Sequence, residues 1–174
     1  MKKILFVALA SIAMIACNGP AKKADNTEKE NTTVETLKVD NLLANAEQLV
    51  DKTIKVTGHV THTCKHSGKR CFLVGDNEKF TVRVEAGGKI TGFNRELVGN
   101  TIMVEGILKE RRLSKEYIDQ MEHETNEKAK EDGTAETCAT EMNNINDMRA
   151  WMKSNNKDHY AIYFIEGLAY EVVE

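Results

Sequence analysis

The stretch Thr53–Thr61, with the sequence TIKVTGHVT, decides the fold. Its apolar or small residues recur at every second position, at Ile54, Val56, Gly58 and Val60, and polar residues fill the positions between them. A period of two residues is typical of a β-strand that buries one face. The stretch therefore predicts a half-buried strand.

Four other stretches have the same character. They are Arg70–Gly75, Phe80–Glu85, Thr101–Leu108 and Tyr160–Val173. Phe80 shares the apolar parity of Val82 and Val84, so we expect its ring in the core. The last and longest strand is expected to bend at Gly167. Five strands are therefore predicted.

Three stretches have helical spacing. They are Asp40–Val50, which begins with an Asx cap candidate, Ser114–Glu131 and Asn143–Lys153. The second is strongly polar, so it is expected to be exposed to solvent. The predicted order is a helix, three strands, a connector, a fourth strand, a helical insertion and a last strand. This order fits a small five-stranded barrel better than a sandwich.

Three segments resemble those of a known fold family. They are KVTGHV at 55–60, LVGNTIMVEGI at 97–107 and YFIEGL at 163–168. With them the chain resembles OB-fold domains of the anticodon-binding-like (nucleic-acid-binding-like) superfamily, as found in small bacterial lipoproteins. The resemblance implies a mainly β, five-stranded OB-fold domain over 37–174, with an N-terminal helix and a helical insertion at 113–158 before the last strand. It leaves function open, because this fold carries many unrelated sites.

Residues 1–16 have the features of a lipoprotein signal peptide. Lys2 and Lys3 precede the apolar run Ile4–Ile15, which is shorter than the roughly 20 residues of a membrane span. The run leads into Ile15-Ala16-Cys17, which resembles a bacterial lipobox. This resemblance implies cleavage before Cys17 and attachment of lipid to its sulfur.

Residues 17–36 are predicted to be a lipidated, flexible tether, because they offer almost nothing apolar to bury. Asn18 is not the Asp that resembles an inner-membrane retention signal. We therefore expect the protein in the cell envelope, anchored in the outer membrane and facing the periplasm. The formal net charge of −3 becomes −5 when Lys2 and Lys3 are removed, so the charge gives no general attraction to nucleic acid.

The most distinctive side chains lie between His59 and Cys71. His62, Cys64 and His66 share one parity if the backbone stays extended, and Cys71 returns on the next strand. These four residues are the candidate ligands for Zn or Cu, since imidazole and thiolate bind such metals. The spacing is not a standard zinc-finger spacing, so the pattern suggests a metal without defining one.

Cys64 and Cys71 have a competing interpretation as a disulfide. An exported protein meets an oxidising environment, and the two residues flank one predicted hairpin. Thiol redox chemistry is a third interpretation, because Lys65, Lys69 and Arg70 would lower thiol pKa values. No thioredoxin-like spacing supports it. The disulfide would leave Cys138 single, and Cys138 would be a further soft metal ligand if the helical insertion folds back over the hairpin.

The function predicted from these features is a lipid-anchored binding module, with its His/Cys site at the first barrel hairpin. No catalytic residues and no cofactor-binding motif are recognisable, so an enzyme is not predicted. A metal-free structural domain that docks an envelope protein is the alternative. Single-stranded nucleic acid is the third option, and it lacks a broad basic groove and enough stacking aromatics on the second and third strands.

Overall fold

The structure, a computed structural model, describes residues 35–132 and 135–173. The predicted signal peptide (1–16), the predicted lipid site Cys17 and most of the predicted tether (17–36) lie outside the described residues. None of the helices in the described ranges is long and apolar enough to cross a membrane. The described chain thus comprises the predicted domain from residue 37 and the two residues before it.

Within these ranges the chain forms six strands and four α-helices. The strands are β1 (Thr36–Lys38), β2 (Thr53–Thr63), β3 (Arg70–Val74), β4 (Thr81–Ala86), β5 (Thr101–Ser114) and β6 (His159–Val173). The helices are α1 (Val39–Ala44), α2 (Ala46–Leu49), α3 (Lys115–Asp132) and α4 (Ala135–Ser154), and a short 3₁₀-helix, η1, spans Arg95–Leu97.

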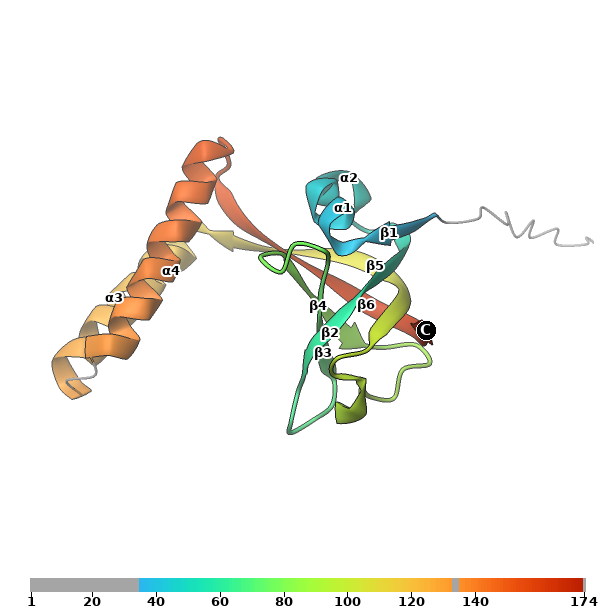
Figure 1. Cartoon of the computed structure of the whole chain (residues 1–174). Coiled ribbons are helices and arrows are strands. Elements are labelled where there is room, and N and C mark those ends of the chain that lie inside the picture. Colours follow the sequence, from blue (N-terminus) through green and yellow to red (C-terminus); the bar gives the residue numbers. More distant parts are fainter. Residues whose placement is uncertain (1–34, 133–134, 174) are drawn as a thin grey trace, which may run out of the picture. The chain divides into compact units, whose positions relative to one another are not determined.

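Five of the strands form a closed barrel (Figure 1). Their order is β2, β3, β4, β6, β5, and the pairing of β5 with β2 completes the ring. Neighbours in the ring are antiparallel, except that β4 and β6 run parallel. β1 lies outside the ring and pairs with β2 in parallel. The predicted mainly β, five-stranded barrel is confirmed, and β1 is a strand that the sequence does not predict.

Alternation along β2 places Ile54, Val56 and Val60 in the barrel core, as predicted. Gly58 lies on the same buried face, where its neighbours leave no room for a side chain. A Cβ there would lie 2.8 Å from both Val39 Cγ2 and the Val74 carbonyl oxygen. Gly58 therefore allows α1 and β3 to pack directly against β2.

The predicted helix over Asp40–Val50 is interrupted. Asn45 leaves the helical conformation between α1 and α2, and its side-chain Nδ2 donates to the Asn41 carbonyl oxygen at 2.9 Å. A short polar side chain that bonds to the backbone competes with helix continuation. Leu42 and Ala46 are still buried against the barrel, so the two short helices together cover the core.

Phe80 does not occupy the predicted core position. It precedes β4, where its N–H donates to the Asn77 carbonyl oxygen at 3.0 Å, and 48% of the residue's surface is exposed. Val82 and Val84 on β4 are fully buried. The parity rule fails at Phe80 because the residue still belongs to the turn and not to the strand.

β5 and β6 remain paired from Thr101–Val173 to Ser114–His159. β5 leads directly into α3, and α4 ends at Ser154, shortly before β6 begins. The two helices pack on Leu113 and form a second small core around Ile118 and Ile145. Arg149 Nη2 on α4 joins them by 2.6 Å contacts to carboxylate oxygens of Asp119 and Glu122 on α3. The predicted insertion is therefore a helical hairpin, and α4 begins earlier than the predicted Asn143.

The close approach of β6 to β5 depends on Gly106 in β5, so replacement of this glycine is expected to destabilise the fold. A Cβ at Gly106 would lie 2.5 Å from Ile165 Cγ2 and 2.6 Å from the Glu166 carbonyl oxygen. We expect Gly106→Ala to reduce the free energy of unfolding by about 1–3 kcal/mol, which is typical of overpacking. Urea unfolding would measure the change.

Gly92→Ala is the matched control, because its added Cβ would meet only the Gly68 carbonyl group, with ordinary contacts of 3.5 Å to the oxygen and 3.9 Å to the carbon. We expect this variant to differ from the wild type by less than about 1 kcal/mol. Equal stability losses in the two variants would contradict the packing role of Gly106.

Candidate functional site

The first hairpin does not align the predicted ligands. The register of β2 against β3 shifts between Val60 and His62, and the chain curls into a turn after Cys64, whose carbonyl accepts from the Gly68 N–H at 3.0 Å. His66 therefore lies in an exposed turn and not on an extended strand. The sequence predicts that His62, Cys64 and His66 share one side of an extended strand, and His66 does not lie there.

Cys64 and Cys71 have different surroundings. Cys71 is fully buried in the barrel core and faces the register partner Thr63, which is also buried. Cys64 follows Thr63 and is partly exposed, and both cysteines are free thiols. Among the described residues, no three His, Cys, Asp or Glu side chains gather as a metal site. Metal binding and the disulfide stay predictions.

The two thiols differ in acidity. The Ser67 hydroxyl lies 3.5 Å from Cys64 Sγ and donates to it, and this hydrogen bond is the main cause that lowers the pKa of Cys64 to about 7. Burial raises the pKa of Cys71 to about 12. Near neutral pH Cys64 is therefore the reactive thiol of the pair.

The histidines of the hairpin make contacts of their own. The His62 ring lies 5.8 Å from the Phe72 ring, centre to centre. His59 Nδ1 lies 2.8 Å from the Thr101 hydroxyl. Cys138 is buried in α4, within the helical hairpin. The side chains that make the sequence distinctive are thus spread over several local environments.

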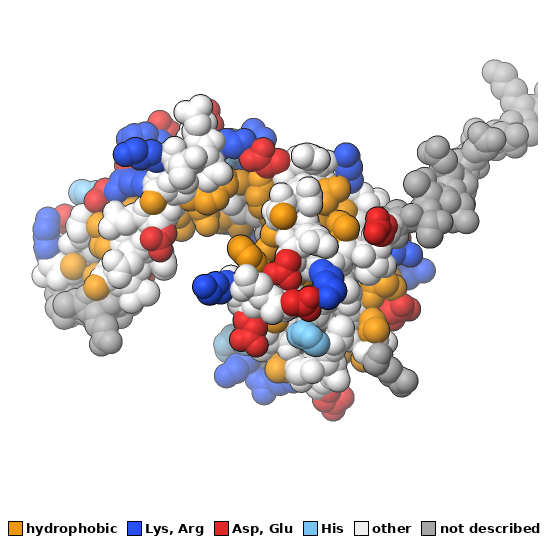
Figure 2. Space-filling model, turned by 45° about the horizontal axis from the view of Figure 1, so that its top comes forward, with side chains coloured by type: hydrophobic (Ala, Val, Ile, Leu, Met, Phe, Trp, Pro, Cys, Tyr) orange, Lys and Arg blue, Asp and Glu red, His pale blue; other side chains and the backbone are white. Residues whose placement is uncertain are grey.

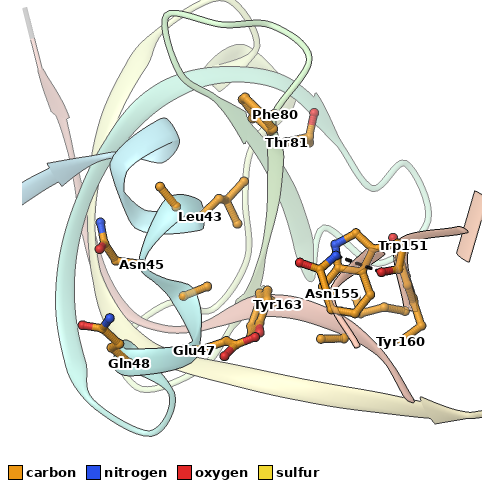
Figure 3. Close-up of a pocket in the computed structure, with 14 residues that line it drawn as sticks. Leu43, Asn45, Glu47, Gln48, Phe80, Thr81, Trp151, Asn155, Tyr160 and Tyr163 are labelled. Carbon is orange, nitrogen blue, oxygen red and sulfur yellow. Dashed lines mark hydrogen bonds between the residues drawn. The ribbon is translucent and has the colours of Figure 1, made fainter. Parts of the chain in front are cut away.

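A second region of the chain has the features of a ligand site. A cavity of about 550 Å³ lies between the α1–α2 segment, the start of β4, the end of α4 and the start of β6 (Figure 3). Figure 2 shows hydrophobic side chains in the hollow between the helical hairpin and the barrel. We call this cavity the aromatic groove and define it by Leu43, Phe80, Trp151, Tyr160 and Tyr163. Its volume is typical of small-ligand sites, which span about 300–1,000 Å³.

The rings of the groove are held by neighbouring groups. Trp151 and Tyr160 meet edge to face with ring centres 5.2 Å apart, a favourable arrangement for aromatic pairs. Asn155 Nδ2 donates to the Trp151 carbonyl oxygen at 2.8 Å, which fixes the chain where α4 ends. Burial is the first cause that raises the pKa of Tyr163, and the negative charge of Glu110 adds to it. The Tyr163 hydroxyl therefore stays protonated at neutral pH.

The groove carries one charged side chain, and that charge is neutralised. Glu47 lines the cavity from α2, and its carboxylate lies 2.9 Å from the Lys157 ammonium. The other polar side chains of the lining are Asn45, Gln48, Thr81 and Asn155. The groove thus combines aromatic rings with uncharged hydrogen-bonding groups.

A row of side chains crosses the strands of the barrel. Phe72 on β3 pairs with Arg83 on β4, which pairs with Phe164 on β6, which pairs with Lys109 on β5. The Arg83 guanidinium carbon lies 5.0 Å from the Phe164 ring centre, a cation–π distance. Sequence reasoning missed this row because it considered aromatics on β3 and β4 alone, whereas β6 lies beside β4.

The cations of this row have acidic partners. Arg83 Nε lies 3.2 Å from Glu85 Oε1, and Lys109 Nζ lies 2.9 Å from Asp51 Oδ1. The Arg83 contact is an ion pair without hydrogen-bond alignment, because this nitrogen has no hydrogen-bond partner in the described part of the chain. The row therefore offers two rings and little unpaired positive charge.

Comparisons with known proteins identify no family. No protein-family model matches the chain, and no curated protein matches it. Two solved structures are similar in part. An aspartyl-tRNA synthetase-like protein from Leishmania major Friedlin has 13% identity and a TM-score of 0.41; the match covers 89% of this chain and 23% of that chain. A DUF3299 family protein from Pseudomonas aeruginosa PAO1 has 12% identity and a TM-score of 0.39, over 81% of this chain and 97% of that chain.

The different environments of the two hairpin thiols predict selective alkylation. In the native protein we expect iodoacetamide to modify Cys64 and to spare Cys71, because Cys71 is buried and protonated. The Cys64 thiol is protonated below its pKa, so its rate should fall as pH drops below about 7. Peptide mass spectrometry after timed labelling would measure both rates.

Ser67→Ala is the control for the cause of the low pKa. Loss of the hydroxyl donor should move the midpoint of the Cys64 rate profile upward, toward the ordinary thiol value of 9.0. Equal rates at Cys64 and Cys71 in the folded protein would contradict the observed burial. An unchanged midpoint in the variant would exclude Ser67 as the cause.

Proposed function

We propose that this protein is a binding module of the bacterial cell envelope, built on an OB-fold barrel and anchored by lipid on Cys17. The strand order β2-β3-β4-β6-β5 with closure onto β2, and the parallel pairing of β4 and β6, support the OB-fold assignment. The lipobox-like sequence ending at Cys17 supports the anchor. Cell fractionation of the wild type and Cys17→Ser tests the anchor, since loss of the lipid should release the variant from membranes.

The aromatic groove carries the proposal of a binding function. Phe80, Trp151, Tyr160 and Tyr163 reach one cavity from three separate elements, and Phe80 remains largely exposed there. An exposed aromatic side chain beside other partly exposed rings is costly to leave in water and favourable to cover with a ligand. The groove therefore replaces the first hairpin as the proposed binding site.

Ligand binding in the groove predicts a localised response to small molecules. In ¹⁵N NMR spectra recorded with a library of polar and aromatic fragments, we expect shift changes to concentrate at residues 43–48, 80–81 and 151–163. Phe80→Ala should lower the affinity for the fragments about tenfold, because it removes one aromatic wall of the groove.

Tyr117→Ala is the matched control, since Tyr117 is an aromatic residue of α3 with 44% of its surface exposed, and it does not line the groove. This variant should bind fragments as the wild type does. Shift changes confined to residues 62–71 would contradict the groove and return the site to the His/Cys hairpin.

Single-stranded nucleic acid is the second candidate ligand, and the row Phe72–Arg83–Phe164 is the observation that favours it. Two rings in one row of a barrel wall, on the strands at either side of β4, can stack bases. The candidate ranks second because Glu85 and Asp51 neutralise the cations of the row. Phosphate contacts normally dominate such affinity.

Fluorescence anisotropy with a labelled single-stranded oligonucleotide tests the second candidate. If the row binds bases, Phe72→Ala and Phe164→Ala should each cost about 1–3 kcal/mol of binding free energy. Tyr117→Ala should cost nothing. An affinity that falls steeply with salt but is unaffected by either Phe variant would assign binding to scattered charges and contradict the row.

A further inference from the structure

We infer that the ligand of the aromatic groove is a neutral saccharide, bound with its ring faces on the aromatic side chains. This inference rests on the proposed function, and it adds the chemical class of the ligand. A sugar ring presents apolar C–H faces and a rim of hydroxyl groups. The groove presents both complements, because aromatic rings and uncharged polar side chains line the same cavity.

The polar groups of the lining match hydroxyl groups better than ions. An amide side chain offers both a donor and an acceptor, and so does a hydroxyl group. Gln48 on α2 has no side-chain hydrogen bond within the described residues, so both functions of its amide are available. Asn45 and Asn155 use Nδ2 on backbone carbonyl groups at 2.9 and 2.8 Å, which holds their side-chain oxygen atoms in place as acceptors.

The charges of the groove argue against an ionic ligand. Glu47 is the acid that would attract an organic cation to the rings, and the Lys157 ammonium already lies 2.9 Å from it. An organic cation would have to displace Lys157, and an anion would meet Glu47. A neutral ligand does neither. A purely apolar chain would fill the cavity but leave the amides of Asn45, Gln48 and Asn155 without partners, which costs binding free energy.

The location of the rings favours a short chain of sugars over a single ring. Phe80 enters the cavity from the turn before β4, whereas Trp151 and Tyr160 belong to α4 and β6 (Figure 3). The cavity is open to solvent on the face that Figure 2 shows. Separate aromatic positions along an open groove suit successive sugar units, each of which covers one ring.

Trp151 gives a direct measurement, because it is the chain's one tryptophan. The purified protein is titrated with the β-1,4-linked trimer of N-acetylglucosamine and with maltotriose while the Trp151 emission is recorded. We expect a saturable change with at least one trisaccharide. Because the ligand is neutral, the dissociation constant should stay within about twofold between 0.05 and 0.5 M salt, a range over which exposed charges are strongly screened.

Four variants test the residues that the inference uses. Phe80→Ala should weaken trisaccharide binding about tenfold, and Gln48→Ala should weaken it about three- to tenfold, the range for one hydrogen bond. Tyr117→Ala should stay within about twofold of the wild type, since Tyr117 does not line the groove. The fourth variant, Glu47→Gln, removes the carboxylate that would attract an organic cation, and it serves for the comparison with choline. Thermal melts of all four variants test whether the fold is retained. We expect it to be, because Phe80 and Gln48 are exposed side chains.

The outcomes separate this inference from the proposed function. No saturable response to either trisaccharide at about 10 mM, or an equal response in Phe80→Ala, overturns the saccharide assignment. The saccharide assignment is also overturned if choline chloride binds more tightly than the trisaccharides and loses its binding in Glu47→Gln. That result would identify an organic cation as the ligand. If the NMR shift changes caused by the fragments still map to the groove, the proposed binding function is retained and only the saccharide assignment is rejected. If they do not, both proposals fall.

Discussion

The structure depends on β5, the strand whose pairing with β2 closes the ring and which leads from the barrel into the helical hairpin. β5 completes the barrel by pairing with β2 from Thr53–Ile107 to His59–Thr101, and it pairs with β6 along its whole length. The same strand continues past the barrel and leads into α3. This one strand therefore sets two things: its ladder with β2 closes the core, and its ladder with β6 sets the position of Tyr160 and Tyr163. The groove exists only while the β5–β6 ladder is in register, because a slip of one residue would turn these rings to the opposite face.

The strands could be predicted from the sequence because a barrel wall buries one face of each. Alternation in Thr53–Thr61 locates β2, and the same period locates β4 and the inner part of β5. The rule fails where burial no longer follows the strand. β1 has only three residues and no fully buried side chain, so it leaves no pattern. Asn45 interrupts a helix whose apolar spacing continues across the break, because a polar side chain competes locally for the backbone while Leu42 and Ala46 remain in the core.

The candidate binding site was harder to predict than the strands, because rare residue types that are close in sequence drew the prediction to another place. His62, Cys64, His66 and Cys71 attract attention because they are rare residue types close in sequence. Closeness in sequence does not make a site when a register shift and a turn intervene, and Cys71 serves as a small core residue. The groove is the opposite case. Its residues are ordinary types from three segments that together span more than a hundred positions. No local motif marks them, and only the tertiary fold brings them together.

The two candidate surfaces differ in how their charges are used, and this difference ranks them. Along the strand row every cation has an acid nearby, which holds Arg83 and Lys109 but leaves little field for phosphate. In the groove the pair Glu47–Lys157 has another consequence: it bridges α2 and the residues after α4 at the edge of a cavity lined by rings and amides. Exposed ion pairs of this kind contribute little to stability. If the groove is the binding site, the larger effect of the pair is on selectivity, because a groove with its charge neutralised gains affinity only from shape, ring contacts and uncharged hydrogen bonds.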